Sequence, residues 1–179
     1  QKDIAKQNIS NAQTTSDVTK AEQTAKTLND DLGNLNQAIS DANSAKSTPN
    51  YNEADPDKQK ALEGALSEAK TAKTSNDPSA VGKATTDLQA AQSGLNGDSK
   101  LATAKEQADQ NIAKLPNLSD GQKDIAKQNI SNAQTTSDVT KAEQTAKTLN
   151  DDLGNLNQAI SDANSAKSTP NYNEADPDK

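Results

Sequence analysis

Four polar side chains cluster in one loop and could bind a metal ion. Asn50, Asn52, Asp55 and Asp57 carry the carbonyl and carboxylate oxygens that calcium prefers as ligands. The loop lacks the glycine and the terminal bidentate glutamate that calcium-binding loops hold at fixed spacing. Residues of these types are also typical of turns and of helix N-caps. We therefore interpret the cluster as structural and predict no metal site.

Other residues that could do chemistry are equally isolated. Gly82–Lys83 is similar to the end of a phosphate-binding loop, but the upstream glycine is missing and Ala84 stands where Ser or Thr is required. Two acidic pairs, Asp30–Asp31 and Asp151–Asp152, are expected on solvated helix faces. The chain has no His, Cys or Arg, so no nucleophile–base pair is visible. We predict no catalytic residue, no cofactor and no enzymatic activity.

Composition limits the chain to thin helical bundles. Hydrophobic residues make up 30% of the sequence, against roughly 45–50% in an ordinary globular domain. Tyr51 and Tyr172 are the two aromatic residues, and we expect Tyr51 to pack against its own bundle rather than a ligand. A net charge of −7 without Arg or stacking aromatics argues against nucleic-acid binding. No apolar run reaches the length that spans a bilayer, so we expect no membrane insertion in this segment.

The sequence contains the same long segment twice. Residues 1–58 recur without change as residues 122–179. Self-similarity at a fixed period is typical of an array in which each unit packs against its neighbours. Such an array offers one surface many times rather than one unique active site. Because the chain starts and stops within units, we interpret it as a fragment of a longer protein. The apolar seams at both ends are then left uncovered. We nevertheless expect a monomer in solution.

One long amphipathic helix dominates the repeated segment. Its apolar residues follow a spacing of three and four that is typical of a single helical seam. We predict a helix from about Ser16 to Lys46, capped by Thr15 or Ser16 and ending before Thr48–Pro49. Gly33 lies near its middle and marks a bend, a close helix contact or a tolerated glycine. The seam consists of Val18, Ala21, Ala25, Leu28, Leu32, Leu35, Ile39 and Ala42, and its copy of Val139, Ala142, Ala146, Leu149, Leu153, Leu156, Ile160 and Ala163.

Two Asp-Pro pairs begin the next helices. After a loop over residues 47–56, Asp55–Pro56 and Asp77–Pro78 each combine an N-cap with proline at the first helical position. These two helices and the second half of the long helix predict a three-helix bundle. Near Gly97 the regular spacing of apolar residues along the helix is interrupted. Gly97 could end one helix while Asp98 caps the next, but we favour a continuous helix with a kink.

A second bundle follows. Its first helix carries the seam Leu101, Ala104, Ala108, Ile112 and Leu115, and ends at Pro116. Ser119 to Gln122 is a capping box, and the short helix after it turns Ile125, Ala126, Ile130 and Ala133 inward. The long helix of the second copy closes this bundle.

These residues carry a resemblance to two known modules. Residues 101–150 resemble a GA module, and residues 51–98, with the motifs YNEAD and LNGD, resemble a FIVAR module. Their alternation is similar to that in the giant extracellular-matrix-binding proteins of staphylococci, and it covers essentially the whole chain.

The resemblance implies a domain organisation and a fold. We expect a partial GA module over 1–29, a FIVAR module over 30–97, a GA module over 98–150 and a partial FIVAR module over 151–179. The fold class is all-α: tandem three-helix bundles joined by long shared helices into an elongated rod.

The resemblance also implies a function. It predicts a cell-wall-associated adhesin on the surface of a Gram-positive bacterium, with fibronectin binding and roles in biofilm and virulence. A passive stalk or spacer without a ligand is the alternative. A carbohydrate- or wall-binding module is disfavoured because sugar sites usually offer aromatic platforms.

Albumin, the ligand of some GA modules, is not an expected partner. Those modules present apolar and aromatic residues on and near their second helix. Here that helix lies within residues 121–134, has no aromatic residue, and carries the polar residues Lys123, Asp124, Lys127 and Gln128. None of these is an anchor of the kind that dominates protein interfaces.

The shared helix makes a stiff rod the expected form of the array in solution, because a helix common to two bundles stiffens their junction. Small-angle scattering should therefore give the profile of an extended, inflexible particle. A compact particle, or a highly flexible one, would contradict this expectation.

Overall fold

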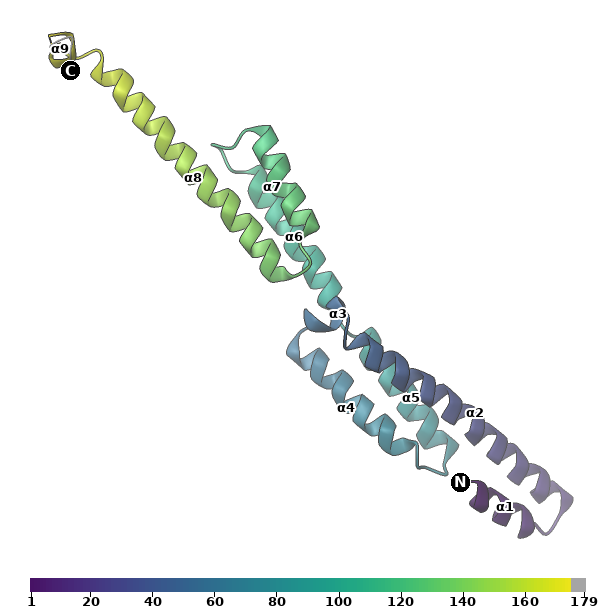
Figure 1. Ribbon diagram of the computed structural model, residues 1–179. Helices are drawn as coiled ribbons and strands as arrows, with labels where there is room; N and C mark the ends of the chain where they lie inside the picture. The colour runs from purple at the N-terminus through teal and green to yellow at the C-terminus, as the bar shows by residue number, and fades with distance from the viewer. Residues whose placement is uncertain (175–179) are drawn as a thin grey trace. The chain divides into compact units, whose positions relative to one another are not determined.

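The computed structural model describes residues 1–174, and the regular elements within that range are helices (Figure 1). The chain divides into two compact units, residues 1–100 and residues 101 onward. The predicted all-α class is confirmed. In the described part of the chain, no helix has both the length and the apolar character needed to cross a bilayer. The helices are α1 (Lys2–Ser10), α2 (Thr15–Ala45), α3 (Pro49–Asn52), α4 (Pro56–Ala72), α5 (Pro78–Ser93), α6 (Gly97–Ala113), α7 (Asp120–Asn132), α8 (Thr136–Ala166) and α9 (Pro170–Asn173).

Helix α2 is uninterrupted over its 31 residues, as the apolar seam predicts. Its cap differs from the prediction: the hydroxyl of Thr14, rather than that of Thr15 or Ser16, accepts a hydrogen bond from the backbone N–H of Asp17 at 3.1 Å. Thr14 has extended backbone angles, whereas Thr15 is already helical. An N-cap needs a non-helical backbone so that its side chain can reach the N–H groups of the first turn.

The two halves of α2 pack against different partners. The first half lies beside α1, and the second half packs with α4 and α5 into the predicted three-helix bundle (Figure 1). Leucines from all three helices, Leu35, Leu62 and Leu88, are fully buried. The complete core of this unit comprises Leu28, Leu35, Ala38, Ala42, Leu62, Leu66, Ala69, Val81 and Leu88.

The second unit repeats the architecture with α6, α7 and the first half of α8. The predicted capping box is present: Ser119 and Gln122 exchange side-chain and backbone hydrogen bonds at the start of α7. One predicted core residue is wrong, because Ile125 is 63% exposed. Neighbouring helical residues are about 100° apart around the axis, so a face centred on Ala126 and Ile130 leaves Ile125 outside. The core comprises Ala108, Ile112, Leu118, Ala126, Ile130, Ala133, Val139 and Ala146.

The connection between α5 and α6 corrects a second prediction. The expected continuous, kinked helix is absent: α5 ends at Ser93 with Gly94 as its C-cap, and α6 begins at Gly97. Residues 47–56 also differ from a plain loop, because Pro49–Asn52 forms α3, a single turn capped by the hydroxyl of Thr48. Proline at the first helical position suits this turn, since its missing N–H would have no partner there.

Gly33 and its copy Gly154 have different surroundings. A Cβ atom at Gly33 would meet nothing within 4 Å, so neither a bend nor a close contact requires glycine there. At Gly154 a Cβ would lie 2.7 Å from the side-chain nitrogen of Asn117. The same side chain donates to the backbone oxygen of Asn150 at 2.9 Å. The glycine of the repeat is therefore merely tolerated in α2, whereas in α8 an asparagine from the α6–α7 connection packs over it.

The second half of α8 is exposed although its sequence equals that of α2. Leu35 is fully buried, whereas its copy Leu156 is 54% exposed. Ile160 is likewise exposed, while its counterpart Ile39 packs against the core of the first unit. The difference arises because α4 and α5 cover this half of α2, and no described helix covers the same half of α8.

This pair of identical sites gives a matched test of the core. Leu35→Ala should lower the free energy of unfolding by about 2–5 kcal/mol, because it leaves a cavity in a packed interior. Leu156→Ala should change it by less than about 0.5 kcal/mol, as exposed substitutions usually do. Denaturant unfolding of both variants measures the difference. Equal losses would mean that the second half of α8 is covered in solution.

Candidate functional site

Asp55 and Asn96 form a reciprocal pair that joins the start of α4 to the start of α6. The side-chain oxygen of Asn96 accepts from the backbone N–H of Asp55 at 3.0 Å, and its Nδ2 donates to Asp55 Oδ2 at 2.7 Å. Asp55 is the N-cap residue of α4, as predicted, but it makes no side-chain capping hydrogen bond there. Its carboxylate is engaged by Asn96 instead. Asp77, the other predicted cap, does accept from the N–H of Ser79 at 2.9 Å.

Lys100 completes this polar junction. Its Nζ lies 2.6 Å from Asp55 Oδ1. The hydrogen bonds from Lys100 and Asn96 stabilise the carboxylate and lower the pKa of Asp55 below its ordinary value of 3.8. Because the folded pKa is the lower one, the contribution of Asp55 to stability is complete above 3.8 and is lost as the pH falls through the folded pKa.

Gly97 lets the backbone of α6 approach α3. A Cβ atom there would lie 2.2 Å from the carbonyl oxygen of Asn50 and 2.9 Å from the backbone nitrogen of Ala54. The next residue, Asp98, donates its N–H to Asn50 Oδ1 at 2.9 Å. Gly97 is therefore required by a close approach of two backbones and not by an unusual backbone conformation, since no described glycine has a positive φ.

The four residues of the suspected calcium loop do not assemble into an ion site. Asn50 and Asp55 face hydrogen-bond donors from the start of α6, whereas Asn52 and Asp57 are exposed and take no part in these contacts. Within residues 1–174, no group of three or more His, Cys, Asp or Glu residues could hold a metal ion. The side-chain oxygens of Asn50 and Asp55 accept hydrogen bonds from the start of α6 instead.

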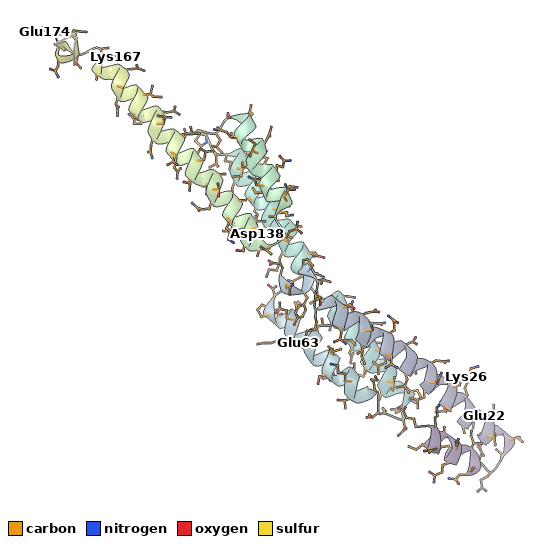
Figure 2. All side chains as sticks on the ribbon, in the orientation of Figure 1. Glu22, Lys26, Glu63, Asp138, Lys167 and Glu174 are labelled. Atoms are coloured by element: carbon orange, nitrogen blue, oxygen red, sulfur yellow. The ribbon has the colours of Figure 1, made fainter. Side chains whose placement is uncertain are left out.

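Tyr51 packs at the foot of its own bundle, as predicted, where it is partly buried against the core. Its hydroxyl donates to Glu63 Oε1 at 2.8 Å, and Lys46 Nζ reaches the same oxygen at 3.1 Å (Figure 2, which labels Glu63 on α4). The Lys46 ammonium also lies 5.8 Å from the centre of the tyrosine ring, within cation–π range. The hydrogen bond from Tyr51 lowers the pKa of Glu63 and raises that of Tyr51. The side chain of Tyr172 lies outside the described part of the structure.

The remaining acidic and basic candidates lie on helix surfaces. Lys83 forms an ion pair with Asp87 one turn along α5. Asp30 and the pair Asp151–Asp152 are exposed, and Asp31 is half-buried. Exposed pairs of this kind contribute little to stability, and the structure does not bring these residues together with any of the others into a common site.

An exposed apolar side chain on α7 was missed by the sequence analysis. Ile125 is 63% exposed, and its copy on α1, Ile4, is 42% exposed. Of the polar residues on this helix, Lys123 donates to the backbone oxygen of Ala113 at 3.3 Å. The signal in the sequence was the adjacent pair Ile125–Ala126, since both members cannot face one narrow seam. The surface of α7 thus offers one aliphatic contact among polar groups.

Two buried polar residues also escaped the sequence analysis. The hydroxyl of Thr85 donates to the backbone oxygen of Val81 at 3.0 Å within α5. Asn150 is buried in α8 and its side-chain oxygen accepts from the N–H of Asn117 at 3.0 Å. Its identical counterpart Asn29 is exposed. Asn150 is buried and hydrogen-bonded because the α6–α7 connection packs against it.

The geometry defines a class of protein: a helical repeat protein in which small bundles share a long helix and polar contacts fix the start of the next helix. Residues 1–31 and 98–152 match the GA module, and residues 31–96 and 152–179 match the FIVAR domain. The chain is 36% identical over its whole length to the extracellular matrix-binding proteins EbhA and ebh of Staphylococcus aureus. It spans 5% and 2% of the lengths of these two relatives. The chain belongs to this family of GA and FIVAR repeat proteins.

Solved structures agree with this assignment. A crystal structure of the 756–1003 domain of EbhA from Staphylococcus aureus is 32% identical, with a TM-score of 0.74 over 81% of this chain and 59% of that chain. A second Staphylococcus aureus crystal structure, of a domain 3912–4037 described as similar to streptococcal adhesins, gives a TM-score of 0.63 at 31% identity. It covers 68% of this chain and 98% of that chain. The family of GA and FIVAR repeat proteins to which the chain belongs is not a family of enzymes.

The close approach at Gly97 gives a test with an internal control. Gly97→Ala should lower the free energy of unfolding by about 1–3 kcal/mol, as overpacking against rigid atoms does. Gly33→Ala, in open space, should raise it by up to about 1 kcal/mol through helix propensity. Thermal or denaturant unfolding of the two variants distinguishes them. A neutral Gly97→Ala variant would show that α6 does not approach α3 this closely in solution.

Proposed function

We propose that the chain is a repeat segment of a bacterial cell-surface adhesin that binds a host extracellular matrix protein, with fibronectin as the expected ligand. The proposal is supported by the names of its relatives, which are called extracellular matrix-binding proteins. We place the segment outside the cell, on the wall of a Gram-positive bacterium. Biofilm formation and virulence are the processes that such adhesion would serve.

The observation that carries the proposal is the shared helix. Helix α2 packs against α1 along one half and against α4 and α5 along the other, so it belongs to two modules at once. We therefore propose module boundaries inside long helices, with modules over 1–29, 30–97, 98–150 and 151–179; residues 175–179 lie outside the described structure. A chain built this way offers the surface of each module again in every repeat.

Binding by repetition fits the surface of the modules. The described surface has no aromatic anchor of the kind that carries strong interfaces, because the ring of Tyr51 packs against its own core. A single weak site becomes useful when linked copies engage a multivalent ligand, which can raise avidity by about 10²–10⁴. We propose the exposed face of α7, with Ile125 and its copy Ile4 on α1, as the contact surface.

The engagement of Tyr51 also favours the alternative, a passive spacer. The side chain of Tyr51, which would most readily anchor a ligand, already contacts Glu63 and Lys46. A chain of this kind would project another domain away from the cell wall without binding anything. The two functions make opposite predictions about binding by longer arrays.

Binding to immobilised fibronectin as a function of repeat number separates them. We expect negligible binding by one GA–FIVAR unit and an apparent affinity that rises by about 10²–10⁴ in tandem arrays. Serum albumin on a parallel surface should remain unbound. Absence of binding to fibronectin at every array length would support the spacer.

A pair of variants tests the proposed face. Ile125→Ser with Ile4→Ser should abolish the gain in avidity, whereas Gln144→Ser with Gln23→Ser, at positions that are exposed in both copies of the long helix, should leave it unchanged. All four of these side chains are exposed, so none of the changes should unfold the modules. An equal loss in both variants would place the contact elsewhere.

A further inference from the structure

Asn96 and Gly97 form the one Asn-Gly dipeptide in the 179-residue sequence. In such a dipeptide the backbone nitrogen of glycine attacks Cγ of the asparagine amide, since glycine has no Cβ to hinder the approach. The new N–Cγ bond closes a succinimide ring, the Cγ–Nδ2 bond breaks, and ammonia leaves with the proton from the glycine N–H. Water then opens the ring to aspartate or isoaspartate. The net reaction consumes one water and releases one ammonia, with no redox change and no enzyme.

The fold opposes each step of this reaction. Both ends of the Asn96 amide are engaged by Asp55, at 3.0 and 2.7 Å, so the side chain cannot turn toward the next peptide nitrogen without breaking two hydrogen bonds. Gly97 is buried against the backbone of α3, within an approach that leaves no room for one added carbon. Movement of the Asn96–Gly97 peptide therefore requires the α3–α6 junction to open.

The product would no longer fit the junction. Aspartate at position 96 would replace the donor Nδ2 with a second carboxylate oxygen facing Asp55 Oδ2, across a contact that is now 2.7 Å. Like charges at this separation repel. Isoaspartate would add a methylene to the main chain next to Gly97, where the carbonyl oxygen of Asn50 already crowds the backbone. Either product holds the junction open.

We propose that Asn96–Gly97 is a fold-protected deamidation site, at which opening of the α3–α6 junction permits succinimide formation and the product prevents the junction from closing again. Each opening of the α3–α6 junction that leads to deamidation would leave an irreversible chemical change at residue 96. It requires only water as a co-reactant, so it can operate wherever the protein resides. This inference stands independently of the proposed matrix ligand.

Peptide mass spectrometry after incubation at mildly alkaline pH tests the proposal on the full chain. In the native protein, conversion at Asn96 should be at least about tenfold slower than in the same protein in guanidinium chloride, because local opening limits the reaction. Hydroxylamine provides a second readout, since it traps the succinimide and cleaves the chain between Asn96 and Gly97. Asn117, which is followed by leucine, serves as the slow internal reference.

Two variants link the protection to Asp55. Asp55→Ala should raise the native rate severalfold toward the denatured rate, because it removes the carboxylate that accepts from Asn96 Nδ2 and leaves only the hydrogen bond from the backbone N–H of residue 55. Asp77→Ala removes the N-cap of the neighbouring helix and should leave the rate at Asn96 unchanged. Circular dichroism tests whether both variants are folded. If Asp55→Ala does not fold, the native chain in low concentrations of guanidinium chloride replaces it. The deamidation rate at Asn96 should then rise together with the hydrogen-exchange rate of the Asp98 amide. Equal native and denatured rates, or equal effects of the two variants, would overturn the proposal.

Discussion

The burial of one narrow apolar stripe on a long helix is the constraint on which this structure depends. A bundle of about 50 residues buries a small share of its surface and is marginal by itself. The large side chains available for a core are few, and in the first unit the fully buried leucines Leu35, Leu62 and Leu88 come from three different helices. Sharing α2 between α1 and the α4–α5 pair lets a single seam serve two modules. The stability of each module then depends on whether the helix that it shares with its neighbour stays folded.

Polar contacts determine where the next helix begins. The motifs YNEAD and LNGD, at residues 51–55 and 95–98, are far apart in the chain but form two sides of one contact. Asp55 holds both ends of the Asn96 amide, and the backbone of Gly97 lies against that of α3. Hydrogen bonds of this reciprocal kind have stricter geometry than apolar packing. They fix the start of α6 where the apolar core of the first unit ends.

In the proposed function, repetition takes the place of a single deep binding site. An enzyme concentrates its chemistry in one concave site, whereas in this chain the same helix sequences and their exposed side chains occur twice. Few of its exposed side chains could anchor a partner alone, and Ile125 is the most exposed large apolar residue among those described. Affinity in such a protein would come from the number of linked copies, since each further contact is made at high effective concentration.

The exact repeat separates what the sequence determined from what tertiary structure decided. Helices α2 and α8 have identical sequences, equal lengths and equivalent caps at Thr14 and Thr135, because capping and helical periodicity act within a few residues. The seams, both Asp-Pro helix starts and the capping box at Ser119 were predictable for that reason. The prediction for Ile125 was wrong because Ile125 and Ala126 are adjacent, and only one of two adjacent residues can face a narrow helical seam.

Burial and pairing depended on neighbours that local sequence does not encode. Identical leucines are buried at position 35 and exposed at position 156, and identical asparagines are exposed at position 29 and buried at position 150. The sequence left a break near Gly97 as the less favoured alternative, because the contacts of Gly97 are with the backbone of Asn50 and Ala54, more than 40 residues earlier in the chain. The amino-acid sequence determined which segments are helices and which stripe of each is apolar. Contacts between distant segments alone decided which half of each stripe is covered, because the free energy of burial belongs to a pair of surfaces and not to either one.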